Sequence, residues 1–232
     1  GVVMPAVGEA IARHGGFFWL FAVAALVLAT ALLIVQRLPE TGRPRQEQPQ
    51  PRRGPGEGAG PLLLGGVMIG LAYGVLTVFV PVARIASAPG RAGVFFFAYF
   101  AGLIGARLAG GLGLSWIARP AILLPAYMIL AGGLAMLSLG DSVILLVGVA
   151  LTCGLSHGVL MPVIYALLLF GVSRYRRGWT VALLAAAFDL GNVAGAMGLG
   201  LVAERLGYSG IFVLAAGMVA VGAAVAHWWG RR

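Results

Sequence analysis

The sequence predicts an all-α membrane protein, a polytopic bundle of transmembrane helices. Of its 232 residues, 60% are hydrophobic and only 10% are charged, and the mean hydropathy is +0.98. A water-soluble domain of this length has too little interior to bury so much apolar surface. The apolar residues also fall into stretches of roughly 20, the length of helix that crosses a bilayer.

Taken in order, the elements begin with a partial apolar helix that ends near His14, a turn at residues 9–16 and a full span at residues 17–36. Six further candidate spans follow a polar stretch; they cover residues 61–83, 92–113, 119–139, 142–170, 179–203 and 208–229. Pro120 and Pro125 interrupt the start of one of them. Because the chain starts inside an apolar helix and without a methionine, we interpret it as N-terminally incomplete.

The polar stretch at residues 37–60 divides the chain. It is rich in Pro, Gly, Gln, Arg and Glu, a composition that cannot bury a core. We therefore expect a flexible linker there. The predicted organisation is one and a half helices in residues 1–36, the linker in residues 37–60, and one compact block of six helices in residues 61–232.

The net charge of +9 comes from arginine, since the chain has no lysine. Following the loops alternately puts most arginines on one side of the predicted membrane: Arg37, Arg43, Arg45, Arg52, Arg53, Arg119, Arg174, Arg176, Arg177, Arg231 and Arg232. Arg13, Arg84, Arg91 and Arg205 fall on the other side. The positive-inside rule makes the richer side cytoplasmic, with the C-terminus inside. This distribution favours a lipid bilayer as the partner of these charges and excludes nucleic acid.

Small residues at four-residue spacing predict which helix faces are crowded, because helices in lipid associate through close packing. Three such stripes occur: Gly66, Gly70 and Gly74; Ala98, Gly102, Ala106 and Gly110; and Gly191 with Gly195. Static packing and rocking of one smooth face on another both fit these stripes. At an offset of 90 residues, Gly105, Ala106 and Gly110 match Gly195, Ala196 and Gly200. This repeat predicts two inverted three-helix units.

Three ionisable residues lie within predicted spans, where a charge costs at least about 2.5–3.5 kcal/mol and marks a protein interior or a wet surface. Asp189 is about 13 Å from the nearer helix end, close to the bilayer midplane. It fits a proton or cation site, and equally a permanent ion pair. Arg107 is about 9 Å from its helix end, so it can reach the interface, bind substrate or extend toward Asp189. His157 suits a proton-coupled step or an ordinary interhelical hydrogen bond.

Further polar side chains accompany these three. Asn192 shares a helix face with Asp189, three positions earlier. Tyr73, Thr77, Tyr99, Ser156 and Tyr165 supply hydroxyl groups, each of which alone is typical of interhelical hydrogen bonding or interfacial anchoring.

Two enzyme motifs are missing from the sequence, the phosphate-binding GxxxxGK[ST] and the metalloprotease HExxH, and no ligand stands at metal spacing from His157. Cys153 is the single cysteine and cannot form a disulfide within the chain. We expect no enzyme activity, no cofactor and no metal.

The long basic loop followed by six helices resembles the second half of a major facilitator superfamily transporter. The run from Ala187 to Gly195, continuing through Gly200 to Glu204–Tyr208 and Phe212, resembles that family's eleventh helix and exterior turn, and residues 154–162 are similar to its tenth. Residues 1–21 resemble the end of the fifth helix and the entry to the sixth. The resemblance implies that residues 1–36 are the end of an N-terminal half and that residues 61–232 form the C-terminal half. The other helices of the N-terminal half, which are missing from this chain, would be its partners.

The resemblance also implies an alternating-access carrier. We therefore expect a secondary active transporter of a small organic solute in a bacterial inner membrane, coupled to H⁺, with efflux favoured over uptake. Asp189 would be the coupling or gating carboxylate and Arg107 its partner, while His157, Asn192 and Tyr73 would line the pathway. Two alternatives stay open. One is a non-transporting receptor, partner module or inert truncated product, and the other is an intramembrane enzyme that pairs His157 with Asp189.

Overall fold

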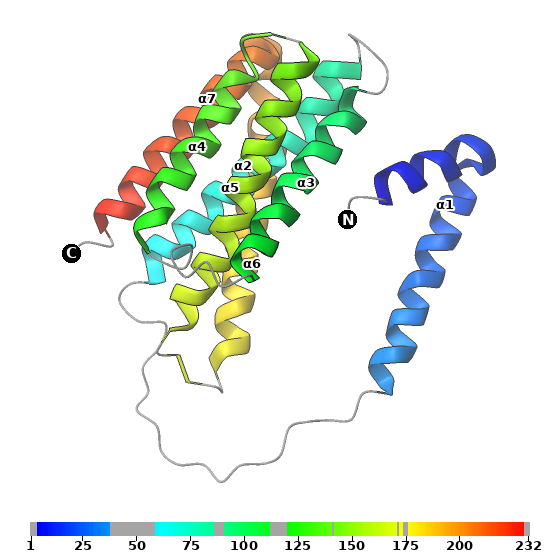
Figure 1. Cartoon of the computed structure of the whole chain (residues 1–232), viewed down its shortest axis with the longest axis horizontal. Helices are drawn as coiled ribbons and strands as arrows, with labels where there is room; N and C mark the ends of the chain where they lie inside the picture. Colours follow the sequence, from blue (N-terminus) through cyan, green and yellow to red (C-terminus); the bar gives the residue numbers. More distant parts are fainter. Residues whose placement is uncertain are drawn as a thin grey trace. The chain divides into compact units, whose positions relative to one another are not determined.

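A computed structural model describes residues 4–37, 59–85, 91–111, 120–140, 142–170, 172–173 and 176–229. The chain forms two compact units, Gly1–Pro51 and Arg52–Arg232, and each is described by itself (Figure 1). The predicted linker at residues 37–60 falls almost entirely outside the described residues.

The first unit contains one described element, the helix α1, which runs from Met4 to Gln36. The predicted turn at residues 9–16 lies within this helix, which bends in its N-terminal part in Figure 1. The apolar stretch Phe21–Ile34 of this helix falls within the predicted span at residues 17–36.

The second unit is a bundle of helices (Figure 1). Its α-helices are α2 (Ala59–Ile85), α3 (Arg91–Gly111), α4 (Leu123–Met136), α5 (Val143–Leu169), α6 (Arg177–Val193) and α7 (Gly200–Trp229). A 3-10 turn (Pro120–Ile122) precedes α4, and a π-helical turn (Ala194–Gly198) follows α6. Within the described ranges every regular element is helical, which confirms the predicted all-α class.

Five of these segments are long and apolar enough to cross a membrane, among the residues that the structure describes. The predicted 119–139 span is shorter, because Pro120 starts a 3-10 turn and residues 137–139 leave the helix. Ser142 caps the start of α5, where its hydroxyl accepts a hydrogen bond from the backbone N–H of Leu145 at 3.2 Å.

The predicted break between the last two spans is at Gly207. This residue has φ +64°, a left-handed backbone conformation that glycine adopts without steric cost. Before the break, the π-helical turn covers Ala194–Gly198, in which every residue except Met197 is glycine or alanine. Turns of this kind occur mostly as single bulges within α-helices, often at functional sites. In this protein the turn follows directly from the helix that carries Asp189 and Asn192.

The helices of the bundle pair in a two-fold pattern. Helix α3 packs mainly against α5, and α6 packs mainly against α2. In the same way, α4 packs against α5 and α7 packs against α2. Helices α4 and α7 also pack against each other. Exchanging α2 with α5, α3 with α6 and α4 with α7 leaves this set of major contacts unchanged. The contacts therefore support the prediction of two equivalent three-helix units.

Glycines hold the α3–α5 and α2–α6 pairs at backbone contact. A Cβ added to Gly154 would meet the carbonyl of Tyr99, and one on Gly70 would meet the carbonyl of Phe188. Gly191 stands in the same way against the backbone of Val67. Such close approach is available only where the side chain is a hydrogen atom, so the glycines of the predicted stripes, apart from Gly110, lie in the contact surfaces.

These contacts also correct the register of the internal repeat. Gly102 and Gly191 occupy matching places on α3 and α6, 89 positions apart, whereas the sequence match was at 90. With the offset of 90, Gly105 would be paired with Gly195, yet Gly105 faces open space while Gly195 packs against the Leu71 backbone. Gly110 also faces open space. Glycine and alanine are so frequent here that a shift of one residue preserves the apparent match.

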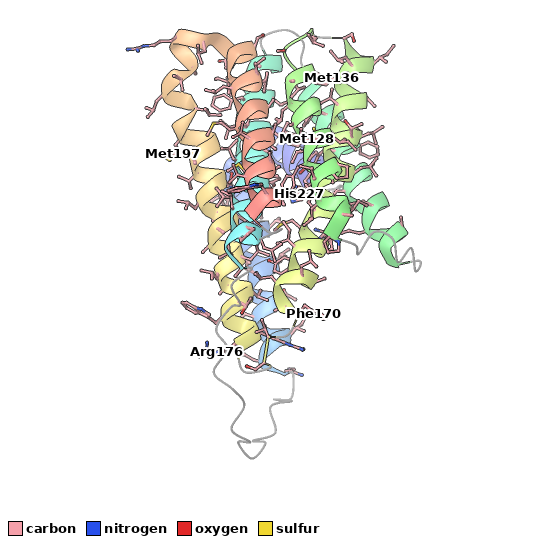
Figure 2. All side chains as sticks on the ribbon, turned by 90° about the vertical axis from the view of Figure 1, so that its left-hand side faces the viewer. Met128, Met136, Phe170, Arg176, Met197 and His227 are labelled. Carbon is pink, nitrogen blue, oxygen red and sulfur yellow. The ribbon has the colours of Figure 1, made fainter. Side chains whose placement is uncertain are left out.

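Large apolar side chains cover the outside of the bundle. Ile144 and Leu201 are more than four-fifths exposed, at 88% and 86%. Met197 extends outward from the bundle in Figure 2 and is 70% exposed. An apolar exterior of this extent suits hydrocarbon as the solvent.

The glycine contacts generate a stability prediction. In Gly102→Ala, the new Cβ would lie 2.5 Å from the Leu151 carbonyl oxygen, so α3 and α5 must separate. We expect a loss of about 1–3 kcal/mol in the free energy of unfolding, measured by denaturation in mixed detergent micelles.

Gly105→Ala is the matched control on the same helix. Its Cβ would meet nothing within 4 Å, so we expect it to be neutral or slightly stabilising, by up to about 1 kcal/mol. Equal effects of the two substitutions would show that the glycine contact does not control the packing of α3 on α5.

Candidate functional site

Four helices each place one ring near the middle of the bundle, and these rings form a ring cluster: Tyr73 of α2, Tyr99 of α3, His157 of α5 and Phe188 of α6. The Tyr73 and His157 ring centroids are 5.7 Å apart with the planes at 83°. Tyr73 lies 5.7 Å from Phe188, and His157 lies 5.9 Å from Phe188. Such spacing is favourable for aromatic pairs, at about 0.5–1.5 kcal/mol each.

The interface glycines bring these rings together. Tyr73 and His157 each follow such a glycine, Gly70 or Gly154, by three positions. Because residues three apart share a helix face, each ring points toward the neighbouring helix that its glycine touches. Tyr99 and Phe188 are the residues whose backbone carbonyls those two glycines face. The same backbone contact therefore sets the position of both partners.

The ring cluster contains one hydrogen bond. The Tyr99 hydroxyl lies 2.5 Å from Nδ1 of His157, and both side chains are buried. In the hydrocarbon region of a membrane, no water is available to hydrogen-bond an unpaired polar group. The Tyr99–His157 hydrogen bond therefore offsets the cost of burying both groups. The arrangement joins α3 to α5 by a polar contact in an otherwise apolar environment.

The structure unites two of the five predicted pathway residues, His157 and Tyr73, in direct ring contact. Asn192 is half-buried one turn beyond Phe188, with its carbonyl and side-chain oxygens facing Gly74. Arg107 is exposed on α3, and its charge reaches His157 and Tyr99 electrostatically.

Asp189 is exposed on α6. No ion pair joins it to Arg107 among the residues that the structure describes, although both are described. The His157 imidazole packs on Phe188, the neighbour of Asp189, and its only described hydrogen bond is to Tyr99. The expected Arg107–Asp189 pairing, and the His157–Asp189 pairing that the intramembrane-enzyme alternative requires, are therefore not formed among the described residues.

Two members of the ring cluster were not singled out from the sequence. In the sequence, Phe188 is part of the run that resembles the family's eleventh helix, and Tyr99 is one of several hydroxyl-bearing residues. A usable signal was nevertheless present. Each of the four rings stands three residues from an interface glycine, which is Gly70, Gly102, Gly154 or Gly191.

Pro162 adds a further polar group beside the ring cluster. Proline has no backbone N–H, so the carbonyl of Gly158, four positions earlier, receives no helical hydrogen bond. Gly158 is adjacent to His157 and packs on Leu103 and Ala106 of α3. The site therefore combines an imidazole, a phenol hydroxyl and a carbonyl that lacks its usual helical donor.

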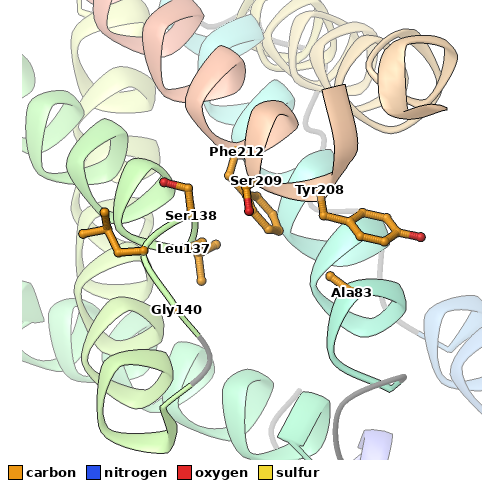
Figure 3. Close-up of a pocket in the computed structure, with 8 residues that line it drawn as sticks. Ala83, Leu137, Ser138, Gly140, Tyr208, Ser209 and Phe212 are labelled. Atoms are coloured by element: carbon orange, nitrogen blue, oxygen red, sulfur yellow. The ribbon is translucent and has the colours of Figure 1, made fainter. Parts of the chain in front are cut away.

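A separate pocket of about 270 Å³ lies near the ends of α2 and α4 and beside the part of α7 that follows the break at Gly207 (Figure 3). Its lining includes Ser138, Tyr208, Ser209 and Phe212. The Ser138 hydroxyl donates to the Ala135 carbonyl at 2.6 Å, as is usual within a helix end. None of the predicted pathway residues contributes to this pocket.

Within the described ranges, no group of three or more His, Cys, Asp or Glu side chains is placed to hold a metal ion. Cys153 is fully buried and packs where Gly133 of α4 approaches α5. The predicted pathway residues therefore lie in the ring cluster or elsewhere on α3 and α6.

Comparison with known families gives one match. The model of the family described as Major Facilitator Superfamily matches residues 1–178. The match covers the first unit and the bundle up to the start of α6. No curated protein matches the chain.

Proposed function

This chain belongs to the major facilitator superfamily, a family of membrane transporters, and from that premise we propose that it is a secondary active transporter working by alternating access. The proposed substrate is a small organic solute, transported by proton antiport or proton symport. Efflux is the proposed direction.

The observation that carries this proposal is the ring cluster. Polar groups are costly in hydrocarbon and are kept where they serve a pathway or a partner. Here a hydrogen-bonded histidine stands where four helices converge, held by contacts between glycine-lined surfaces. Such surfaces allow small rotations of one helix against another. A solute or proton that binds one arrangement better than the other shifts the population toward it.

Asp189 and Arg107 supply the proposed charged groups. Both are exposed on the bundle, and neither can face hydrocarbon without a cost of at least about 2.5–3.5 kcal/mol. We therefore propose that they face a water-filled pathway, and that a second helical bundle of the N-terminal half closes it from the other side. Asp189 would take up the coupling proton, and Asn192 and Tyr73 would line the pathway.

The proposed orientation puts the arginine-rich loops and the C-terminus in the cytoplasm of a bacterial cell, with the bundle in the inner membrane. Phe170 and Arg176 lie at one end of the bundle in Figure 2, the end where α6 begins. Trp179, at that end, is 66% exposed, and Trp228, near the end of α7, is 57% exposed. Exposed tryptophan and arginine at helix ends are typical of the membrane–water interface.

The first prediction concerns Asp189. The full-length protein is reconstituted in liposomes with an internal pH dye, and a panel of organic solutes is screened for solute-dependent proton movement. Asp189→Asn keeps the shape of the side chain but cannot titrate. We expect it to reduce solute-dependent proton flux on the order of 100-fold, while counterflow of labelled solute continues.

Glu204→Gln is the control, because it makes the same change of carboxylate to amide near the start of α7. It should leave proton flux unchanged. Full proton flux in Asp189→Asn at every pH would reject the coupling role of this carboxylate.

The second prediction concerns orientation. Single cysteines are placed at Gln48, Ser173 and Ser209 in a Cys153→Ala background, and intact cells and inverted vesicles are treated with a membrane-impermeant maleimide. Gln48 and Ser173 should react only in inverted vesicles, and Ser209 only in intact cells. Reaction of Gln48 and Ser173 from opposite sides would contradict the proposed topology.

A further inference from the structure

We infer that Tyr99 is a positioning residue that holds His157 neutral with its proton on Nε2, so that this N–H recognises a hydrogen-bond acceptor on the solute. The solute class that fits the site is an apolar carboxylate. This inference rests on the proposed transport function and adds to it the chemistry of recognition.

The direction of the Tyr99–His157 hydrogen bond determines where the ring proton lies. The Tyr99 side chain is only 1% exposed, and Nδ1 of His157, at 2.5 Å, is the acceptor available to its hydroxyl among the described residues. If Nδ1 carried a proton, the Tyr99 O–H would be buried without an acceptor, at a cost of about 1–3 kcal/mol. The hydroxyl therefore donates to Nδ1, and the neutral ring carries its proton on Nε2.

Nε2 stays available to a ligand. It has no hydrogen-bond partner among the described residues, and His157 is 8% exposed. In the described part of the chain, the Tyr127 hydroxyl is the buried side-chain polar atom that lacks both a partner and accessible surface. Nε2 of His157 is not such an atom. The imidazole thus has one nitrogen held by the protein and the other at accessible surface.

The two-fold pattern makes this site one-sided. Tyr99 of α3 and Phe188 of α6 occupy equivalent positions, as do His157 of α5 and Tyr73 of α2. Where α3 meets α5, Tyr99 forms a hydrogen bond with His157. Where α6 meets α2, Phe188 has no hydroxyl and contacts Tyr73 only through its ring. Phe188 and Tyr73 are half-buried, so part of each ring is accessible. One side of the site therefore offers an N–H donor and the other an aromatic surface.

Charge selects among the possible acceptors. Arg107 is exposed, and its positive charge reaches both His157 and Tyr99. This field favours an acceptor that carries negative charge and disfavours a cation. A carboxylate beside an apolar or aromatic portion satisfies the donor, the arginine and the two accessible rings together.

The first test reads the tautomer directly. The full chain is labelled with ¹⁵N-histidine in lipid nanodiscs, and the His157 signals are identified by their loss in His157→Gln. At neutral pH we expect a pyridine-type Nδ1 and a pyrrole-type Nε2 in the wild-type protein, and a mixture of tautomers in Tyr99→Phe.

Tyr127→Phe is the matched control for this test. It removes a second buried tyrosine hydroxyl, one without a partner among the described residues, and should leave the His157 signals unchanged. A protonated Nδ1 in the wild-type protein, or no change in Tyr99→Phe, would overturn the positioning role.

The second test uses benzoate, benzamide and benzylamine as probes, with binding measured by calorimetry at one pH and without any gradient. Benzoate should bind most tightly, and Tyr99→Phe should raise its dissociation constant about tenfold. Tyr127→Phe should not. Absence of benzoate binding, or equal binding of benzylamine, would overturn the solute class.

These outcomes are separable from those of the transport proposal. Binding and the tautomer need no proton gradient, so benzoate binding through His157 without proton-linked flux would reject only the transport proposal. Solute-driven flux that Tyr99→Phe leaves unaltered would reject only the inference made here.

Discussion

Close backbone approach at glycine is the constraint on which the rest of this structure depends. In hydrocarbon, helices gain little from excluding solvent, so they associate through van der Waals contact and a few hydrogen bonds. Gly102 and Gly154 allow α3 and α5 to touch through their backbones, and Gly70 and Gly191 do the same for α2 and α6. Without this approach the four rings would not meet, and the Tyr99 hydroxyl could not reach His157.

The same contact is built twice with different side chains, and the proposed recognition site depends on that difference. A repeated scaffold needs matching glycines because the backbone geometry repeats. It does not need matching rings. Tyr99 and Phe188 are equivalent in place but only one can donate a hydrogen bond, and His157 and Tyr73 differ likewise in chemistry. Two-fold packing therefore supplies rigidity, while the departure from two-fold chemistry supplies a polar and an aromatic side.

The charged groups elsewhere in the bundle also lie apart from the two-fold packing surfaces. Asp189 and Arg107 sit on exposed faces of α6 and α3, and no ion pair joins them in this conformation. A carboxylate and a guanidinium that do not pair with each other can respond to protons and solutes, as the proposed alternating-access cycle requires. The π-helical turn after α6 lies on the same continuous segment as Asp189, and its Gly195 packs against the Leu71 backbone of α2.

The sequence by itself determined that this is an all-helical membrane protein, roughly where its spans lie, and which faces are crowded, because length, hydropathy and small-residue spacing act locally along the chain. It also predicted His157 and Tyr73 as pathway residues, since polar groups in apolar spans are conspicuous, and their rings are in contact. Only the tertiary structure decided that Tyr99 and Phe188 complete their site, that Arg107 and Asp189 stand apart, and that the repeat is offset by 89 and not 90. Those facts depend on which helices meet and in what register, and residues far apart in sequence carry no local signal of either.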